Sequence, residues 1–197
     1  PIMASVSGTF PMALMLLSTY IKPFIGAAAQ YIWYFAIALH IVLIVYFTIK
    51  FILKLDMTKV FASYYIVYVG IAVAAVTAPA YGQLGIGTAA FWFGFVTLIA
   101  LLILVTVRYT KYKNVPEPAQ PLFCIYAAPT SLCIAGYVQS VTPKSRTFLL
   151  VMLAVATVIY VIALVKAIGY LKLKFYPSYA AFTFPFVISA IATKQTM

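Results

Sequence analysis

Long apolar runs, separated by short breaks of charged residues, proline and glycine, dominate this sequence. A helix crosses a hydrocarbon core about 30 Å thick with about 20 consecutive apolar residues, and the runs have about this length. A bilayer offers the backbone no hydrogen-bond partners, so a helix is the form in which such a run crosses it. We therefore predict an all-α membrane protein with seven transmembrane helices over residues 2–20, 27–53, 60–80, 84–108, 121–140, 146–171 and 177–193.

Composition supports a membrane-spanning class. Hydrophobic residues make up 66% of the 197 residues and charged residues 8%, and the mean hydropathy is +1.11. Soluble domains are about half apolar and about a quarter charged. The connections between the runs are short, so we predict that residues 1–197 form a single transmembrane domain. Cys124 and Cys133 fall on opposite faces of one predicted helix, which indicates packing roles and no disulfide between them.

The net charge of +11 indicates membrane topology rather than nucleic-acid binding. The cations flank the predicted helices, with nine on the side of the second, fourth and sixth connections and four on the other side. By the positive-inside rule the nine-cation side is cytoplasmic, so we expect the loops around 54–59, 109–120 and 172–176 in the cytoplasm. The nine are Lys50, Lys54, Lys59, Arg108, Lys111, Lys113, Lys166, Lys172 and Lys174, and the four are Lys22, Lys144, Arg146 and Lys194.

Helix-breaking residues recur at a regular interval in the odd-numbered runs. Pro11, Gly70, Pro129 and Pro185 are separated by 59, 59 and 56 residues, and each interval covers one helical hairpin. This pattern predicts a repeated two-helix unit in one orientation. The odd-numbered runs have Gly, Ala, Ser, Thr or Pro at about half of their positions, against under a third in the even-numbered runs. Small residues let helices approach closely, so we expect the odd-numbered helices inside and the even-numbered helices outside.

A ring of broken inner helices would enclose a space along its axis. At membrane depth the carbonyls freed at a break need hydroxyl groups, neighbouring helices or water, and Thr9, Thr130, Ser131 and Thr183 lie beside the breakers. We therefore predict a pore whose wall includes the breakers and the threonines beside them. A purely structural role for the breakers is the alternative, because proline and glycine are common in membrane helices. Three and a half hairpins leave the ring open, so we expect helices to be missing from one or both ends.

The sequence offers little chemistry for an enzyme or a cation transporter. Its two acids, Asp56 and Glu117, lie in predicted loops, whereas proton and cation pathways use carboxylates inside the membrane. Motifs for zinc proteolysis or a serine nucleophile are absent from the sequence, so we expect no enzyme, cofactor or metal site. For His40, on an outer helix, we predict packing or a local hydrogen bond. Lys194 closes the last run without a nearby acid, which does not fit a retinal Schiff base.

Permeation by an anion fits a wall of this kind. Helix N-termini carry a partial positive charge, and backbone N–H and hydroxyl groups along an axis stabilise anions. Such a path without formal charge would hold an anion weakly, which suits passage better than tight binding. We therefore predict transport of a small inorganic or organic anion across the lipid bilayer, and no nucleic-acid partner.

Four segments occur in a characteristic order and spacing: PIMASVSGTFPMALMLL (Pro1–Leu17), YYIVYVGIAVAAVTAP (Tyr64–Pro79), CIYAAPTSLCIAGY (Cys124–Tyr137) and SYAAFTFPFVISAIAT (Ser178–Thr193). In these segments the chain resembles the tellurite-resistance/dicarboxylate transporter family, which includes TehA-type bacterial proteins, fungal malate and sulfite transporters and plant slow anion channels. The resemblance covers essentially the whole chain. It implies a fragment of a ten-helix, five-hairpin ring around a central pore, often assembled as a homotrimer, with this chain as the third through ninth helices.

The resemblance also implies a gate. In family members a phenylalanine of the ninth helix plugs the pore, and the match places it at Phe184 in the stretch AFTFPF. Phe10, in the first TFP, would be a second constriction. The chain departs from the family pattern at Gly70, which takes the place of a proline, with Pro79 nine residues later. We expect the bend of that helix to differ.

Three functions remain open at this point. The leading hypothesis is an anion channel or channel-like anion exporter of the plasma (inner) membrane, with kinked inner helices and a phenylalanine gate. A proton-coupled C4-dicarboxylate (malate) carrier would share the fold. A non-transporting membrane receptor or scaffold is the alternative from another class.

Overall fold

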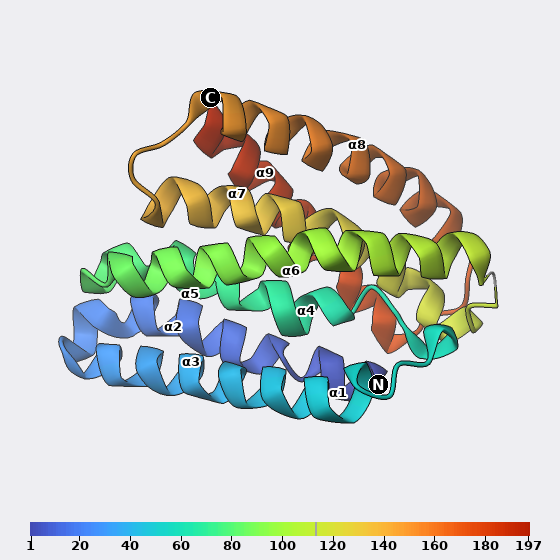
Figure 1. The fold of residues 1–197 in the computed structure, drawn as a ribbon, viewed down its shortest axis with the longest axis horizontal. Helices are drawn as coiled ribbons and strands as arrows, with labels where there is room; N and C mark the ends of the chain where they lie inside the picture. The colour runs from blue at the N-terminus through green and yellow to red at the C-terminus, as the bar shows by residue number, and fades with distance from the viewer. Residues whose placement is uncertain (113) are drawn as a thin grey trace.

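The structure, a computed structural model, describes residues 1–112 and 114–197. Lys113, one of the nine cations counted above, lies outside the described residues. Within the described residues the chain is helical and contains no strand, and its helices run along one common long axis (Figure 1). The predicted all-α class is confirmed. Judged by length and composition, six stretches could cross a membrane: Ile2–Ile25, Ala28–Ile52, Tyr64–Tyr81, Leu84–Lys111, Glu117–Ser140 and Arg146–Tyr170.

The even-numbered predicted helices are long and continuous. Each begins and ends within three residues of the predicted bounds. Apolar side chains cover much of their outer surfaces, which suits contact with lipid. They are α3 (Ala28–Phe47), which continues into a π-helical turn (Thr48–Ile52), α6 (Leu84–Lys111) and α8 (Arg146–Tyr170).

The odd-numbered predicted helices are each divided into shorter segments. The first consists of α1 (Ile2–Val6) and α2 (Thr9–Ile25). The third consists of α4 (Tyr64–Tyr68), a 3-10 turn η3 (Val69–Ile71), α5 (Ala72–Thr77) and a 3-10 turn η4 (Ala78–Tyr81). The fifth consists of a 3-10 helix η5 (Glu117–Ala127) followed by α7 (Ala128–Ser140). The seventh consists of a 3-10 helix η6 (Pro177–Phe182) and α9 (Phe184–Thr196).

Each proline breaker stands in the first turn of a new α-helix. Pro129 and Pro185 are the second residues of α7 and α9, and Pro11 is the third residue of α2. The first N–H groups of a helix have no partner within it, so proline removes no hydrogen bond there. These positions avoid the cost of about 3 kcal/mol that an interior proline carries. Gly70 differs as expected, because it lies in the 3-10 turn η3 and no proline starts α5.

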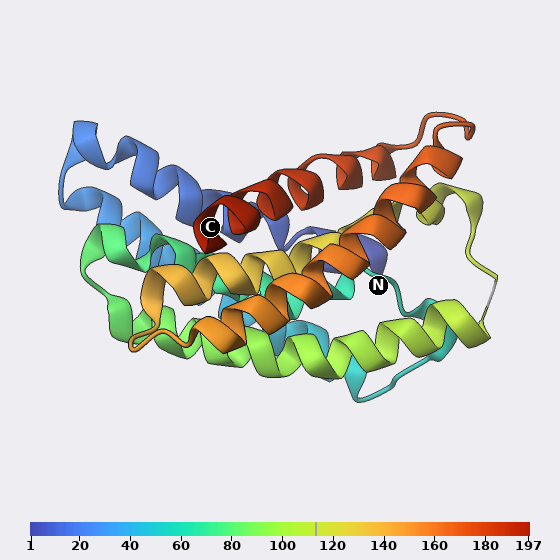
Figure 2. The same ribbon diagram turned by 90° about the horizontal axis from the view of Figure 1, so that it is seen from above.

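The third and fifth predicted helices form the centre of the molecule. In Tyr64–Tyr81 and Glu117–Ser140, 72% and 83% of the most apolar stretch is buried, compared with 17 to 33% in the spans that contain α3, α6 and α8. Figure 2 shows α2 and α9 on the face opposite α6, at the two edges of the inner group. The inner helices therefore form an arc, and α3, α6 and α8 lie against its outer side.

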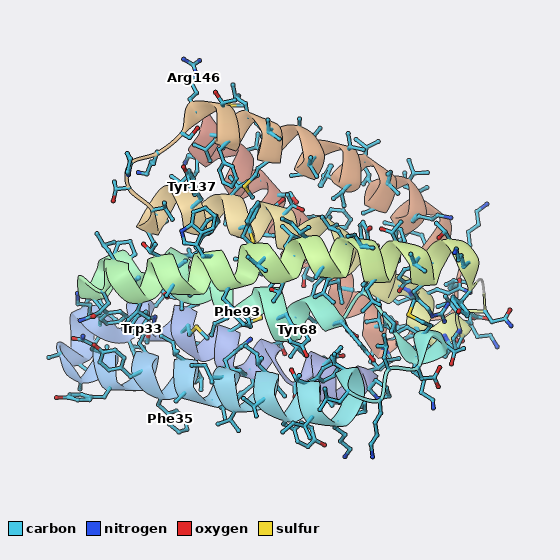
Figure 3. The ribbon with its side chains drawn as sticks, in the orientation of Figure 1. Trp33, Phe35, Tyr68, Phe93, Tyr137 and Arg146 are labelled. Atoms are coloured by element: carbon cyan, nitrogen blue, oxygen red, sulfur yellow. The ribbon has the colours of Figure 1, made fainter. Side chains whose placement is uncertain are left out.

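The outer helices present distinct inner and outer faces. On α3, Trp33 is fully buried and Phe35 is 61% exposed, and Figure 3 shows the two rings pointing in opposite directions. The Trp33 indole donates a hydrogen bond of 2.7 Å to the hydroxyl of Thr77. This buried contact holds α3 against the third inner helix.

Neighbouring inner helices meet at equivalent positions. The hydroxyl oxygens of Ser5 and Ser63 lie 2.7 Å apart, and those of Ser131 and Ser189 lie 3.1 Å apart. Both pairs are separated by 58 residues in the sequence. This interval is close to the spacing of the helix breakers, as expected for parallel inner helices of adjacent repeat units.

The connections after α3, α6 and α8 lie together at one end of the molecule, on the right in Figure 1. We call this end the basic end, because the flanking cations of these connections gather there. The connections between α2 and α3, between α5 and α6, and between α7 and α8 lie at the opposite end. All inner helices therefore run in the same direction, away from the basic end.

Helix α6 packs on the inner helices through glycine. A Cβ atom at Gly87 would lie 2.3 Å from the Ser140 hydroxyl oxygen and 2.7 Å from the Ala78 Cβ atom. A Cβ atom at Gly85, two residues earlier in the same helix, would meet nothing within 4 Å. The close approach of α6 to the centre therefore requires glycine at one of these positions and not at the other.

Replacement of Gly87 by Ala is expected to lower the free energy of unfolding by about 1–3 kcal/mol, the usual cost of overpacking. The matched substitution Gly85→Ala should be neutral or stabilising by up to about 1 kcal/mol, because alanine loses less backbone freedom than glycine on folding. Thermal unfolding of the detergent-solubilised variants measures both. Equal midpoints for Gly87→Ala and Gly85→Ala would contradict the packing described here.

Candidate functional site

The broken inner helices enclose a cavity of about 720 Å³. Among the described residues its wall comes from α1, α2, α4, η3, η5, α7, η6, α9 and the residues beside them, and from none of α3, α6 and α8. The described part of the wall contains no charged side chain. The cavity is thus a feature of the inner helices alone, and its surface is mostly apolar.

The cavity reaches from the basic end past the level of the helix breaks, as far as Leu16 of α2. Pro116, Pro118 and Pro177 line it at the basic end, and Leu132 and Phe184 line it at the depth of the breaks. An apolar cluster of buried residues lies against the cavity at and past this depth. That cluster contains Met12, Met15, Ile71, Ala72, Leu132, Ala135 and Ile188, and Phe184 packs against it.

The structure brings six of the nine predicted site residues together at this cavity. Those that line it are Thr9, Gly70, Pro129, Thr183, Phe184 and Pro185. The other three are Phe10, Pro11 and Thr130, and none of them is among the lining residues. Phe10 is 60% exposed, whereas Pro11 and Thr130 are buried. The second constriction at Phe10 stays a prediction.

The three phenylalanines of AFTFPF point to three different surroundings. Phe184 is half-buried and lines the central cavity. The Phe182 ring packs edge-on against Tyr179, with 4.9 Å between centroids. The Phe186 ring packs edge-on against Tyr160 of α8, with 5.6 Å between centroids. One phenylalanine of the motif therefore faces the cavity, and it is the residue predicted as the gate.

Hydroxyl groups satisfy some of the carbonyls at the breaks. Thr9 donates to the Val6 carbonyl and Thr183 to the Ala180 carbonyl, each at 2.8 Å. Thr130 differs from these two threonines, because its hydroxyl is buried without a partner. Its predicted role in satisfying a carbonyl is therefore wrong. Since the two lining threonines donate to the backbone, their hydroxyl hydrogens are not free for a passing ion.

The break at Gly70 is supported by His40 of α3. The His40 Nε2 atom lies 2.9 Å from the Val67 carbonyl oxygen, so the Nε2–H tautomer is the donor. A Cβ atom at Gly70 would lie 2.7 Å from the Met12 sulfur and 3.0 Å from the His40 Cε1 atom. Glycine therefore leaves room for both side chains behind the cavity wall. Packing or a local hydrogen bond was predicted for His40, and the hydrogen bond that the structure shows is made to a break on another helix, which the sequence did not indicate.

Three α-helices begin at the cavity. The first-turn residues Thr9 of α2, Pro129 of α7 and Phe184 of α9 all line it. Each helix N-terminus carries a partial positive charge of about half a unit. The inner helices are parallel, so these partial charges add. Partial positive charge from three helix starts therefore lies at the wall, although no formal charge lies on its described part.

Arg108 ties the loops together at the basic end. Its side chain is buried, and its guanidinium donates to the carbonyls of Thr58 at 3.0 Å and Asn114 at 3.1 Å, and also to that of Tyr112. Within the described ranges no carboxylate forms an ion pair with it. Backbone carbonyls compensate only part of a full charge, so Arg108 adds to the positive field of this end.

Comparison with known proteins gives one family. The model of the family SLAC1, described as voltage-dependent anion channel, matches residues 1–197. No curated protein matches the chain. Among the described residues there is no group of three or more His, Cys, Asp or Glu that could hold a metal ion.

Replacement of His40 by Leu is expected to leave the Val67 carbonyl buried without a donor, at a cost of about 1–3 kcal/mol in the free energy of unfolding. The control His40→Gln retains an N–H donor and should lose less. Thermal unfolding in detergent, followed by the amount of monodisperse protein that remains, measures the difference. A loss for His40→Leu no larger than that for His40→Gln would show that the hydrogen bond does not stabilise the break.

Proposed function

Because the chain belongs to the SLAC1 family, described as voltage-dependent anion channel, we propose that its inner helices form an anion-conducting path occluded at rest by Phe184. The protein is an integral membrane protein with apolar spans, and membership of this family supports an anion channel or transporter. The observation that carries the finer proposal is the cavity, which is lined by the broken inner helices alone and reaches to Phe184.

The path begins in the positive field of the basic end. Eight described cations lie in or beside its connections: Lys50, Lys54, Lys59, Arg108, Lys111, Lys166, Lys172 and Lys174. Such a field raises the local concentration of anions and lowers that of cations, over a screening length of about 8 Å at physiological salt. The basic end therefore selects the sign of the ion before it enters the cavity.

The wall of the path favours passage over binding. The helix N-termini of α2, α7 and α9 supply partial positive charge at the depth of the breaks. No formal charge lies on the described wall, and the hydroxyl groups of Thr9 and Thr183 are engaged with the backbone. An ion that meets only partial charges is attracted weakly enough to leave again, as conduction requires.

Phe184 is suited to close the path. Its ring lines the cavity at the depth of the breaks and packs against the neighbouring apolar cluster. An apolar constriction of this kind excludes a hydrated ion by dewetting. We propose that rotation of this one ring, or its removal, connects the cavity to the opposite end of the molecule.

The proposal includes the setting of the path. We place the loops around 54–59, 109–120 and 172–176 in the cytoplasm of a cell whose plasma membrane holds the protein, because the basic end satisfies the positive-inside rule. In this orientation the cavity opens toward the cytoplasm and Phe184 separates it from the exterior. We also propose that residues 1–197 act as a single transmembrane domain. We propose in addition that the protein self-associates, because members of the family that it resembles often form homotrimers.

Replacement of Phe184 by Ala is expected to raise anion conductance about tenfold or more, as follows if the ring contributes at least about 1.4 kcal/mol to the barrier. Phe186→Ala is the matched control, because the Phe186 ring packs against α8 outside the cavity. Chloride currents of the intact protein in planar bilayers measure both variants. Unchanged conductance in Phe184→Ala, or an equal increase in Phe186→Ala, would contradict the gate.

The same measurement separates the competing functions. A coupled dicarboxylate carrier would show saturable flux that depends on a proton gradient, with little electrical conductance in the wild type or in Phe184→Ala. A receptor or scaffold would show no anion flux in any variant. A linear conductance that rises on removal of the ring supports the channel.

A further inference from the structure

One of the chain's two carboxylates stands at the mouth of the cavity. Glu117 is the first residue of η5, between Pro116 and Pro118, and both of these prolines line the cavity at the basic end. The Glu117 side chain is exposed. The described wall itself carries no charged side chain, so this carboxylate is the formal negative charge next to the path.

Two hydrogen bonds join η5 to η6 and the residue before it, and one of them is accepted by this carboxylate. The Tyr176 hydroxyl donates to the Glu117 Oε1 atom at 2.9 Å, and the Ser178 hydroxyl donates to the Pro118 carbonyl at 2.6 Å. Ser178 lines the cavity as well. The bond to Glu117 raises the pKa of Tyr176, so the phenol stays protonated and remains the donor. The carboxylate is therefore kept beside the entrance.

The other carboxylate is neutralised by its neighbours. Asp56 forms an ion pair of 2.9 Å with Lys59 and accepts hydrogen bonds from Thr58. The Thr58 hydroxyl, and then Lys59, lower the pKa of Asp56 to about 2. Neither Asp56 nor its partners line the cavity. Glu117 differs on both counts, because its hydrogen-bond partner Tyr176 is a neutral phenol and its neighbours in the chain line the path.

We propose that Glu117 controls anion entry, and that its charge, held at the mouth by Tyr176, limits how readily anions pass from the basic end into the cavity. This inference rests on the proposed anion path. Charges within a screening length of about 8 Å act on ions at an entrance. Since the surrounding cations attract anions, the carboxylate offsets part of that attraction at the point where an ion would otherwise be held.

The test neutralises each carboxylate in turn. Glu117→Gln removes the charge and keeps a carbonyl oxygen that accepts the hydrogen bond from Tyr176, so the joint between η5 and η6 is retained. Asp56→Asn is the matched control at the other acid. Each substitution is made in the intact protein carrying Phe184→Ala, so that the path is open, and chloride current is recorded with chloride driven from either end.

At low salt, Glu117→Gln is expected to raise the current of chloride entering from the basic end about twofold, the size that one unscreened charge several ångströms from an ion produces in water. Current entering from the opposite end should change less. The difference in current between Glu117→Gln and its Phe184→Ala parent should vanish near 1 M salt, where the screening length falls to about 3 Å. Asp56→Asn should leave both currents unchanged.

The outcomes separate this inference from the proposed function. Chloride current in the Phe184→Ala protein that is insensitive to Glu117→Gln at low salt overturns the role of Glu117 and leaves the anion path standing. An equal increase in Asp56→Asn also overturns it, because the effect would then be a general one of loop charge. Absence of chloride current in every variant overturns the anion path and this inference together.

Discussion

The structure depends on one constraint, that every backbone group freed by a helix break inside the membrane needs a partner. The chain meets it by restarting helices rather than by bending them. Prolines stand where a new helix has no use for an N–H group, and Thr9 and Thr183 donate to carbonyls just before the restart. His40 does the same for the break at Gly70 from a neighbouring helix. These local solutions permit broken helices around an axis, and the cavity is their consequence.

Much of the fold follows from sequence because hydrophobicity is a local property. The apolar runs place the outer helices within a few residues, and the breakers place the interruptions of the inner ones. The form of each interruption is not local. Whether a proline kinks a helix or begins another depends on the residues before it. Here Pro118 and Pro121 lie in η5, a 3-10 helix of 11 residues, whereas the sequence predicted a loop up to residue 120 and a membrane helix from residue 121.

The candidate site is likewise predicted by the sequence only in part. Spacing and family resemblance identify residues near the breaks, and six of nine line the cavity. The direction of each side chain depends on the phase in which a helix restarts, which sequence spacing does not define. Phe10 and Phe184 both precede a proline in a TFP motif, yet Phe10 is the second residue of α2 and Phe184 is the first residue of α9. A shift of one residue turns a side chain by about 100°, and one ring faces the cavity while the other is exposed.

The phase in which α9 restarts connects the break at Thr183 with the orientation of the Phe184 ring toward the path. Thr183, between η6 and α9, has φ −86° and ψ −82°, outside the helical values on either side. Pro185 then fixes the start of α9, so the position of Phe184 is defined from both sides by backbone that no ordinary helix contains. A continuous helix through residues 177–196 would present a different face to the axis and would bring no N-terminus to the cavity. The partial positive charge of the α9 N-terminus and the apolar Phe184 ring that lines the cavity therefore have one structural origin, the restart of this helix at Thr183.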